Sequence, residues 1–134
     1  AQRQHASGRL QALNFETQDT TFDLRLPYPV RQLSVASQAR SLVVRMDHGF
    51  VIVDRQGRLL CQGDGPAEVD WACNRALAFH QGRPELFDLR PFRKLRVWNQ
   101  SVPHPVSLSL ARDGRRAVSV DGNGCLDVWE VEGL

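Results

Sequence analysis

The chain has 134 residues, of which 42% are hydrophobic and 24% are charged, and its formal net charge at pH 7 is +2. This size and composition predict one ordinary folded domain, and the small net charge argues against nucleic acid as a partner. Apolar runs fall short of the roughly 20 residues that a membrane-spanning helix requires, and residues 1–8 lack the apolar stretch of a secretory signal. We therefore expect a cytoplasmic protein whose residues 1–8 form a flexible N-terminal segment.

Short apolar segments follow one another along the chain, each bounded by Gly, Asp, Asn or Pro. None of them sustains a helical period, so the pattern predicts an all-β protein. The expected strands, about thirteen in number, are residues 9–16, 20–26, 31–36, 41–45, 50–54, 58–61, 68–72, 76–79, 85–89, 94–98, 106–110, 117–120 and 125–131. A sandwich, a barrel and a propeller are all compatible with such strands.

A repeated pattern narrows these alternatives. An apolar or aromatic residue is followed directly by a carboxylate at spacings of 38, 34 and 42 residues, in Phe15-Glu16, Val53-Asp54, Phe87-Asp88 and Trp129-Glu130. In three copies the pair is preceded, in the same order, by an apolar pattern ending in Ala (33–36, 69–72 and 108–111), an Arg-led apolar run and a turn. A recurrence near 40 residues indicates a tandem supersecondary unit, which a propeller requires and a sandwich does not.

The last copy, from His104 to Val131, closely resembles a WD40 repeat. The His before the first strand, the Asp-Gly turn, the Ser of the second strand and the Trp-acid pair ending the third strand all have counterparts, whereas Val53 and Phe87 replace the Trp in earlier copies. The resemblance implies a structural hydrogen-bond network that would rigidify the blade, with Asn123 as the alternative to Asp121. Its members would be His104, Ser119, Asp121 and Trp129.

The resemblance also implies a domain organisation. Residues 9–134 would form a partial β-propeller of about three four-stranded blades, at 31–61, 68–98 and 106–131, after an incomplete blade at 9–26 that supplies strands c and d. A closed ring needs at least about four blades, and an open blade would leave apolar surface and a strand edge in water. We therefore expect another polypeptide to supply the missing N-terminal blades. A homo-oligomer is less favoured, because residues 9–16 of one copy would compete with residues 125–131 of the other.

No arrangement of residues points to catalysis. The Ser residues lack a nucleophile-elbow setting, the His residues lack ligand spacing, and Cys61, Cys73 and Cys125 have no metal-type spacing, so we expect reduced thiols and no enzyme activity, metal or cofactor. We interpret one basic cluster as a solvated turn and not as a nucleic-acid contact. It consists of Arg90, Arg93, Lys94 and Arg96.

The remaining candidates lie in loops. In WD40 proteins the d–a and b–c loops form the rim that most often binds partners, and here they combine aromatic, His and Arg side chains, which suit an interaction surface. The candidate rim residues are Tyr28, Arg31, Asp47, His48, His80 and Arg83. We expect a non-enzymatic scaffold subunit that binds proteins through this rim. The alternative is an oligomeric carbohydrate-binding propeller with Trp71 or Trp98 as the sugar platform.

Overall fold

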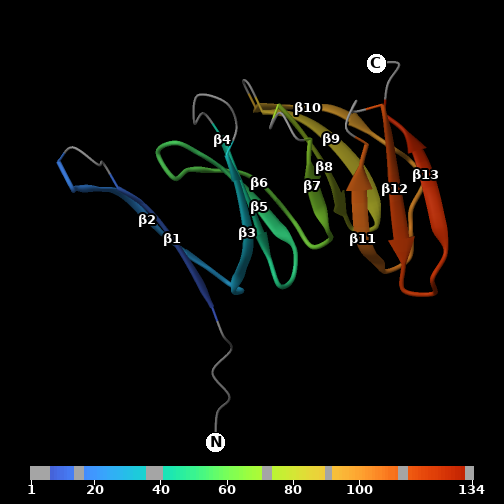
Figure 1. The fold of residues 1–134 in the computed structure, drawn as a ribbon, viewed down its shortest axis with the longest axis horizontal. Helices are drawn as coiled ribbons and strands as arrows, with labels where there is room; N and C mark the ends of the chain where they lie inside the picture. Colours follow the sequence, from blue (N-terminus) through green and yellow to red (C-terminus); the bar gives the residue numbers. More distant parts are fainter. Residues whose placement is uncertain are drawn as a thin grey trace, which may run out of the picture.

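The structure, a computed structural model, describes residues 7–13, 17–35, 41–70, 74–89, 92–111 and 115–131. These residues form thirteen β-strands in four antiparallel sheets that follow one another along the chain (Figure 1). No helix long and apolar enough to cross a membrane occurs in this part of the chain. The prediction of an all-β chain built from four-stranded units is therefore confirmed.

Each sheet is a run of consecutive strands. Sheet I contains β1 (Gly8–Leu13) and β2 (Thr20–Leu26). Sheet II contains β3 (Val30–Val35), β4 (Ser41–Met46), β5 (Phe50–Asp54) and β6 (Leu59–Gly63). Sheet III contains β7 (Ala67–Val69), β8 (Arg75–His80), β9 (Arg83–Leu89) and β10 (Phe92–Val97). Sheet IV contains β11 (Pro105–Leu110), β12 (Arg116–Asp121) and β13 (Leu126–Glu130).

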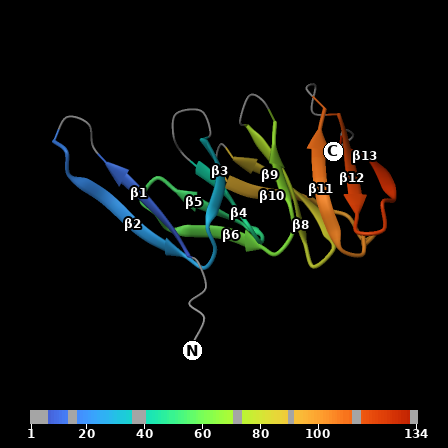
Figure 2. The same cartoon turned by 60° about the horizontal axis from the view of Figure 1, so that its bottom comes forward.

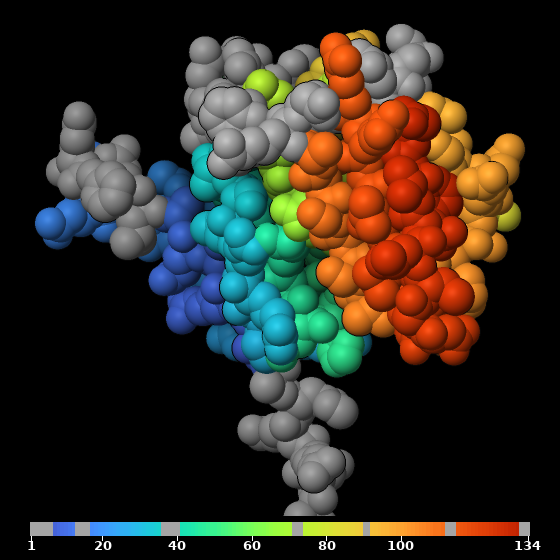
Figure 3. All heavy atoms as spheres, turned by 45° about the vertical axis from the view of Figure 1, so that its right-hand side comes forward, coloured from blue at the N-terminus to red at the C-terminus, as the bar shows by residue number. Residues whose placement is uncertain are grey.

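The sheets stand side by side in chain order from I to IV, as two views of the ribbon show (Figures 1 and 2). The first strand of sheet IV, β11, packs against the first two strands of sheet III, β7 and β8. Figure 3 shows this side of the molecule, with β3 in cyan and β11 in orange. The arrangement is that of successive propeller blades.

Three hydrophobic clusters fill the seams between the sheets. Successive side chains on a strand point to opposite faces, so Val43 packs toward sheet III while its neighbour Val44 packs toward sheet I. Both faces of the two inner strands of a middle sheet are buried, so β4, β5, β8 and β9 are largely continuous apolar runs. Each large side chain buried in a seam contributes about 1.5–3 kcal/mol relative to an exposed one.

Polar bonds also cross the seam between sheets II and III. The buried Ser41 hydroxyl donates to the Leu89 carbonyl at 3.0 Å. Arg45 Nη1 donates to the Ala67 carbonyl at 3.1 Å and to Glu68 Oε2 at 3.0 Å. These bonds tie the second strand of sheet II to the first and third strands of sheet III.

In each described apolar-acid pair, the apolar residue is buried between sheets and the acid pairs with an arginine. Their first residues are buried, with Val53 and Phe87 0% exposed and Trp129 5% exposed. Their acids each face an arginine: Asp54 with Arg58 (2.9 Å), Asp88 with Arg93 (3.7 Å) and Glu130 with Arg116 (3.3 Å). The pair Phe15-Glu16 lies outside the described residues.

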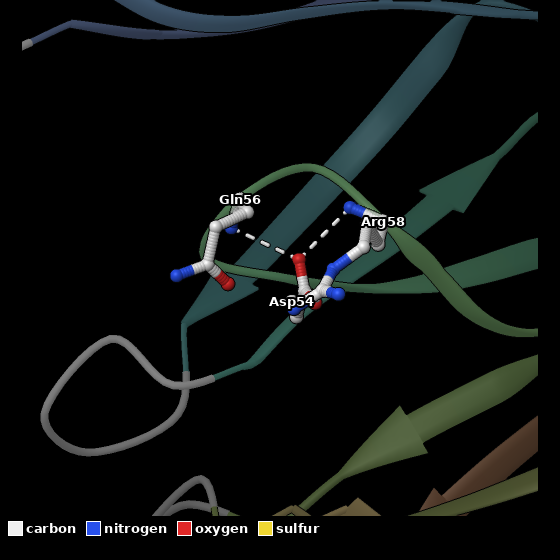
Figure 4. A network of polar contacts seen from close by, with 3 residues as sticks. All are labelled: Asp54, Gln56 and Arg58. Carbon is white, nitrogen blue, oxygen red and sulfur yellow. Dashed lines mark hydrogen bonds and ion pairs between the residues drawn. The ribbon is translucent and has the colours of Figure 1, made fainter.

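Asp54 also closes the turn between β5 and β6 (Figure 4). Its Oδ1 accepts the backbone N–H groups of Gln56 at 2.9 Å and Arg58 at 2.8 Å. Burial acts to raise the pKa of Asp54, but these two N–H groups and the Arg58 guanidinium outweigh it and hold the pKa below its ordinary value of 3.8. Gly57, at φ +84°, completes the turn in a conformation that favours glycine.

Candidate protein-interaction rim

Two of the four residues of the expected structural network meet in the seam between sheets III and IV. The Trp129 Nε1–H donates to Ser119 Oγ at 2.8 Å, and Ser119 is 0% exposed. The Trp129 ring lies edge-on to Phe79, at 6.2 Å between centroids, and to Trp98, at 6.4 Å. The hydrogen bond satisfies the indole N–H inside an otherwise apolar cluster.

The other two network candidates lie elsewhere. Asp121 Oδ1 accepts the backbone N–H groups of Asn123 and Cys125, both at 2.9 Å, and closes the β12–β13 turn as Asp54 closes the β5–β6 turn. His104 is exposed and has a φ of 49°, and its carbonyl accepts the Gly122 N–H at 2.9 Å. Within the described residues its imidazole forms no hydrogen bond with the other three, so the structure separates His104 from Ser119 and Trp129.

The rim residues of sheet II form two close pairs. The Tyr28 and His48 rings meet edge-on with their centroids 5.0 Å apart. Arg31 Nε lies 2.5 Å from Asp47 Oδ1, and the Asp47 N–H donates to the Pro29 carbonyl at 2.9 Å. These contacts hold the β2–β3 loop against the β4–β5 turn, so that an aromatic pair and an ion pair lie next to each other on a fixed backbone.

The rim residues of sheet III lie next to Asp64, a residue that the sequence analysis did not single out. Asp64 Oδ1 accepts the Gln81 N–H at 2.8 Å and lies 3.8 Å from His80 Nδ1. That nitrogen is buried and has no hydrogen-bond partner within the described part of the chain. Arg83 is exposed and lies opposite His80 across the β8–β9 turn.

A groove of about 690 Å³ extends from Arg31, Asp47 and His48 of sheet II to Asp64. Charges of both signs line it, among them Arg31, Asp47, Asp64 and Glu68, with Val106 as an exposed apolar residue. A neighbouring hollow of about 750 Å³ is lined in part by His104. His104 therefore lines the same hollow as Asp64 and Gln81, whereas the resemblance had implied a place in the network.

Other sequence candidates have structural partners. Lys94 Nζ lies 3.4 Å from Glu85 Oε2, and the Arg96 guanidinium stacks over Trp98 at 4.3 Å from the ring centroid. With Arg93 next to Asp88, two of the three described members of the basic cluster have a carboxylate partner, and the third, Arg96, stacks on a ring. Trp98 is 8% exposed and cannot serve as an open sugar platform. Arg90, Trp71 and Cys73 lie outside the described residues.

The described ranges contain no group of three or more His, Cys, Asp or Glu side chains placed to hold a metal ion. Burial, and to a lesser extent the charge of Glu85, raises the pKa of the half-buried Cys61 thiol. Cys125 is exposed. A raised thiol pKa keeps Cys61 protonated and unreactive at neutral pH.

No family model and no curated protein sequence matches the chain significantly. Among solved structures, the crystal structure of the β-propeller domain of Myceliophteria thermophila Cps50 (Swd1) is similar, with a TM-score of 0.57 and 11% sequence identity. The match covers 93% of this chain and 45% of that chain, so this chain spans about half the length of that domain. The fold is therefore that of a β-propeller segment.

Proposed function

We propose that the chain is a non-enzymatic WD40-like scaffold segment that binds proteins through its rim and is completed into a closed propeller by another polypeptide. The observation that carries this proposal is the exposure of one face of sheet IV. The corresponding faces of sheets II and III are buried.

The strand registers identify the corresponding positions. Val43 lies opposite Ile52 in sheet II, Leu77 opposite Leu86 in sheet III, and Val118 opposite Val128 in sheet IV. The first two pairs are 0–1% exposed, whereas Val118 is 37% and Val128 66% exposed. Leu126 corresponds to the buried Phe50 and is 67% exposed. We call Val118, Leu126 and Val128 the open face of sheet IV.

The open face of sheet IV has the same apolar character as the sheet faces that pack against a neighbouring sheet. Hydrophobic side chains at these positions pack against the next sheet in both earlier seams. A docked sheet would gain about 1.5–3 kcal/mol for each large apolar side chain that it buries. A contiguous apolar sheet face is a common mark of a protein interface.

The character of sheet I favours a different polypeptide over a second copy. Leu10 and Leu26 face sheet II, whereas Arg9, Asp23 and Arg25 point to the opposite side. Arg9 Nη2 lies 2.5 Å from Asp23 Oδ2, and this hydrogen-bonded ion pair lowers the pKa of Asp23. Docking this surface onto the apolar open face of another copy would desolvate Arg25 and the Arg9–Asp23 ion pair, and the apolar face would offer them no new polar partners.

The rim supports the scaffold role in a separate way. Its aromatic pair and ion pair are held by backbone bonds, so a partner that binds there would meet a preorganised surface. Charges of both signs in the groove suit a protein segment better than a polyanion. The carbohydrate-binding alternative needs an exposed Trp, but both Trp residues in the described part of the chain, Trp98 and Trp129, are buried.

The test is the association state of the full chain and of a Leu126→Lys/Val128→Lys variant, measured by light scattering over a range of concentrations. We expect the native chain to associate and the variant to remain monomeric. A Gln56→Lys/Gln62→Lys variant adds the same charge at exposed polar positions and should associate like the native chain. A monodisperse, cooperatively melting native monomer would refute completion by another polypeptide.

Binding at the rim is tested by a photo-crosslinking residue placed at His48, with the exposed Arg55 in the β5–β6 turn as the control position. We expect a discrete crosslinked protein from position 48 alone. Equal crosslinking from both positions would show that the rim has no special role.

A further inference from the structure

We propose that the hollow at the rim is a binding site for a cationic side chain, arginine or lysine, of a partner protein. Asp64 would supply the carboxylate that pairs with this cation, and Val106 would contact an apolar residue next to it. This inference rests on the proposed function and names the chemistry that the rim would recognise in its partner.

Three connections between strands form the hollow. Its lining comes from the β6–β7 loop, from the β8–β9 turn, and from the β10–β11 loop with the start of β11. These connections lie at the lower end of the sheets in Figure 1. The volume of about 750 Å³ is within the range of ligand pockets. The space is therefore large enough for an arginine or lysine side chain and its neighbours.

The charges around the hollow favour a cation. Among the described residues that line it, Asp64 carries the only carboxylate, and none is an arginine or lysine. Asp64 also lines the groove, where Arg31 pairs with Asp47 and Arg45 pairs with Glu68. The arginines of the groove are thus already paired with its other two carboxylates, and the charge of Asp64 remains available. A cationic partner complements this distribution.

The Asp64 carboxylate is accessible to such a partner. Its side chain is 68% exposed. Oδ1 accepts the Gln81 N–H at 2.8 Å and lies 3.8 Å from His80 Nδ1, whereas Oδ2 has no hydrogen-bond partner within the described part of the chain. A guanidinium or ammonium group that enters from solvent can therefore form a charge-assisted hydrogen bond with Oδ2.

The walls of the hollow are held in place by backbone hydrogen bonds. The Gly65 N–H donates to the Phe79 carbonyl at 3.1 Å, and the Val102 N–H donates to the Gly82 carbonyl at 2.7 Å. The bond that Asp64 accepts from the β8–β9 turn holds the carboxylate itself. A ligand would therefore meet a preformed site and would not have to order it.

Two residues that line the hollow have an uncommon backbone conformation. Gln81 has a φ of 52° and His104 a φ of 49°. Among the described residues, only one other non-glycine residue, Gln18, has a positive φ. Such conformations are costly for residues with a side chain, and they cluster at binding and active sites. Their concentration around this hollow supports a binding role.

An apolar side chain shares the boundary of both cavities with Asp64. Val106 is 64% exposed and, like Asp64, lines both the hollow and the groove. Apolar contact area beside a polar anchor is typical of protein-binding surfaces. A bound segment with an apolar residue next to its cationic residue would therefore use both side chains.

The test is an NMR titration of the full chain with acetylated and amidated peptides of sequence Gly-X-Leu-Gly, in which X is arginine or citrulline. Citrulline keeps the shape of arginine and removes its charge. We expect saturable shifts of the Gly65, Gln81 and Gly82 amides with the arginine peptide. The citrulline peptide should bind at least about tenfold more weakly, because it cannot form an ion pair. Absence of saturable shifts with the arginine peptide, or equal affinity of the two peptides, would overturn the proposal.

Two matched variants identify the residue that binds the cation. Asp64→Asn removes the charge but keeps an oxygen that can accept the Gln81 N–H, so the Tm should change little. Its affinity for the arginine peptide should fall at least about tenfold. Asp19→Asn removes the same charge from an exposed position before β2 and should leave the affinity unchanged. An Asp64→Asn chain that binds as the native chain does would overturn the role of Asp64.

Failure of this proposal can be distinguished from failure of the proposed function. A discrete crosslinked protein at position 48, together with equal binding of the two peptides, would overturn the cationic ligand and retain the rim as a binding surface. Equal crosslinking from positions 48 and 55 would refute the role of the rim, whatever the peptides show.

Discussion

Ser119→Ala is expected to destabilise the protein by about 1–3 kcal/mol, because it leaves a buried donor without an acceptor. Ser119 is 0% exposed, and its Oγ accepts the Trp129 Nε1–H at 2.8 Å within the seam between sheets III and IV. For a domain of this length, each kcal/mol lowers the Tm by roughly 4 °C. Thermal unfolding followed by circular dichroism would measure the change, at one protein concentration because association makes the Tm concentration-dependent.

A double-mutant cycle isolates the bond. Trp129→Phe removes the donor and keeps an aromatic ring, so adding Ser119→Ala to it should cost about 1 kcal/mol less than Ser119→Ala alone. His104→Ala serves as the control, because His104 is exposed and should change stability by less than about 0.5 kcal/mol. A loss at His104 as large as that at Ser119 would contradict the reasoning and would return His104 to the network. Additive effects of Ser119→Ala and Trp129→Phe would show that the bond contributes nothing.

The remaining predictions concern turns and thiols. Gly57→Ala and Gly124→Ala should each destabilise the fold by about 1–2 kcal/mol, because both glycines have a positive φ. Gly57→Ala should cost more, because its Cβ would lie 2.7 Å from the Phe22 ring, whereas a Cβ at Gly124 would meet no atom within 4 Å. Equal losses in Tm would contradict this. The lowered pKa of Asp54 means that its carboxylate stabilises the fold above pH 3.8 and loses this effect as the pH falls through the lower folded pKa. Asp54→Asn should therefore lose about 1 kcal/mol at pH 7, with the difference from the native chain closing below pH 3.8, and a pH-independent difference in urea unfolding would rule this out. Cys125 should react with maleimide well before Cys61 in peptide-level mass spectrometry, and similar rates would show that Cys61 is not shielded.

The sequence predicted the strands and their grouping because both faces of a blade are buried and each strand is a compact apolar run between turn residues. β2 and β5 have the expected bounds, and β8 differs from the expected strand by one residue at each end. The division into sheets of two, four, four and three strands also agrees with the repeat spacing. The local sequence pattern is enough to predict the strand bounds and the grouping of strands, because neither depends on contacts between residues far apart in the chain.

Alignment of the copies was less accurate. The apolar patterns equated Leu33 with Val69, but the cross-strand registers equate Leu33 with Ala67. A shift of two residues returns every side chain to the same face, so the alternation of a strand cannot detect it. Only the pairing with the second strand, which the structure supplies, fixes the register.

The sequence nominated the candidate rim residues, and their role in binding stays a prediction. Tyr28 and His48 lie in two different turns, and the fold places these turns side by side so that the two rings are in contact. Asp64 was missed because a Gly-Asp-Gly turn has the same sequence whether its carboxylate faces water or a neighbouring turn. The resemblance implied a place for His104 in the network, whereas the structure shows it exposed, with a left-handed backbone at φ 49° that no local residue pattern specified.

The aromatic cluster between sheets III and IV provides an intrinsic optical signal for the packing of sheet IV against sheet III. Trp98 and Trp129, two of the three tryptophans, lie 6.4 Å apart and nearly perpendicular, at 73°. Such closely coupled indoles give strong near-ultraviolet signals that vanish once the rings separate. With Trp71 replaced by Phe, detachment of the C-terminal sheet could be watched optically while the far-ultraviolet spectrum follows the remaining strands. Whether the last blade peels away before the others would then be visible without any added label.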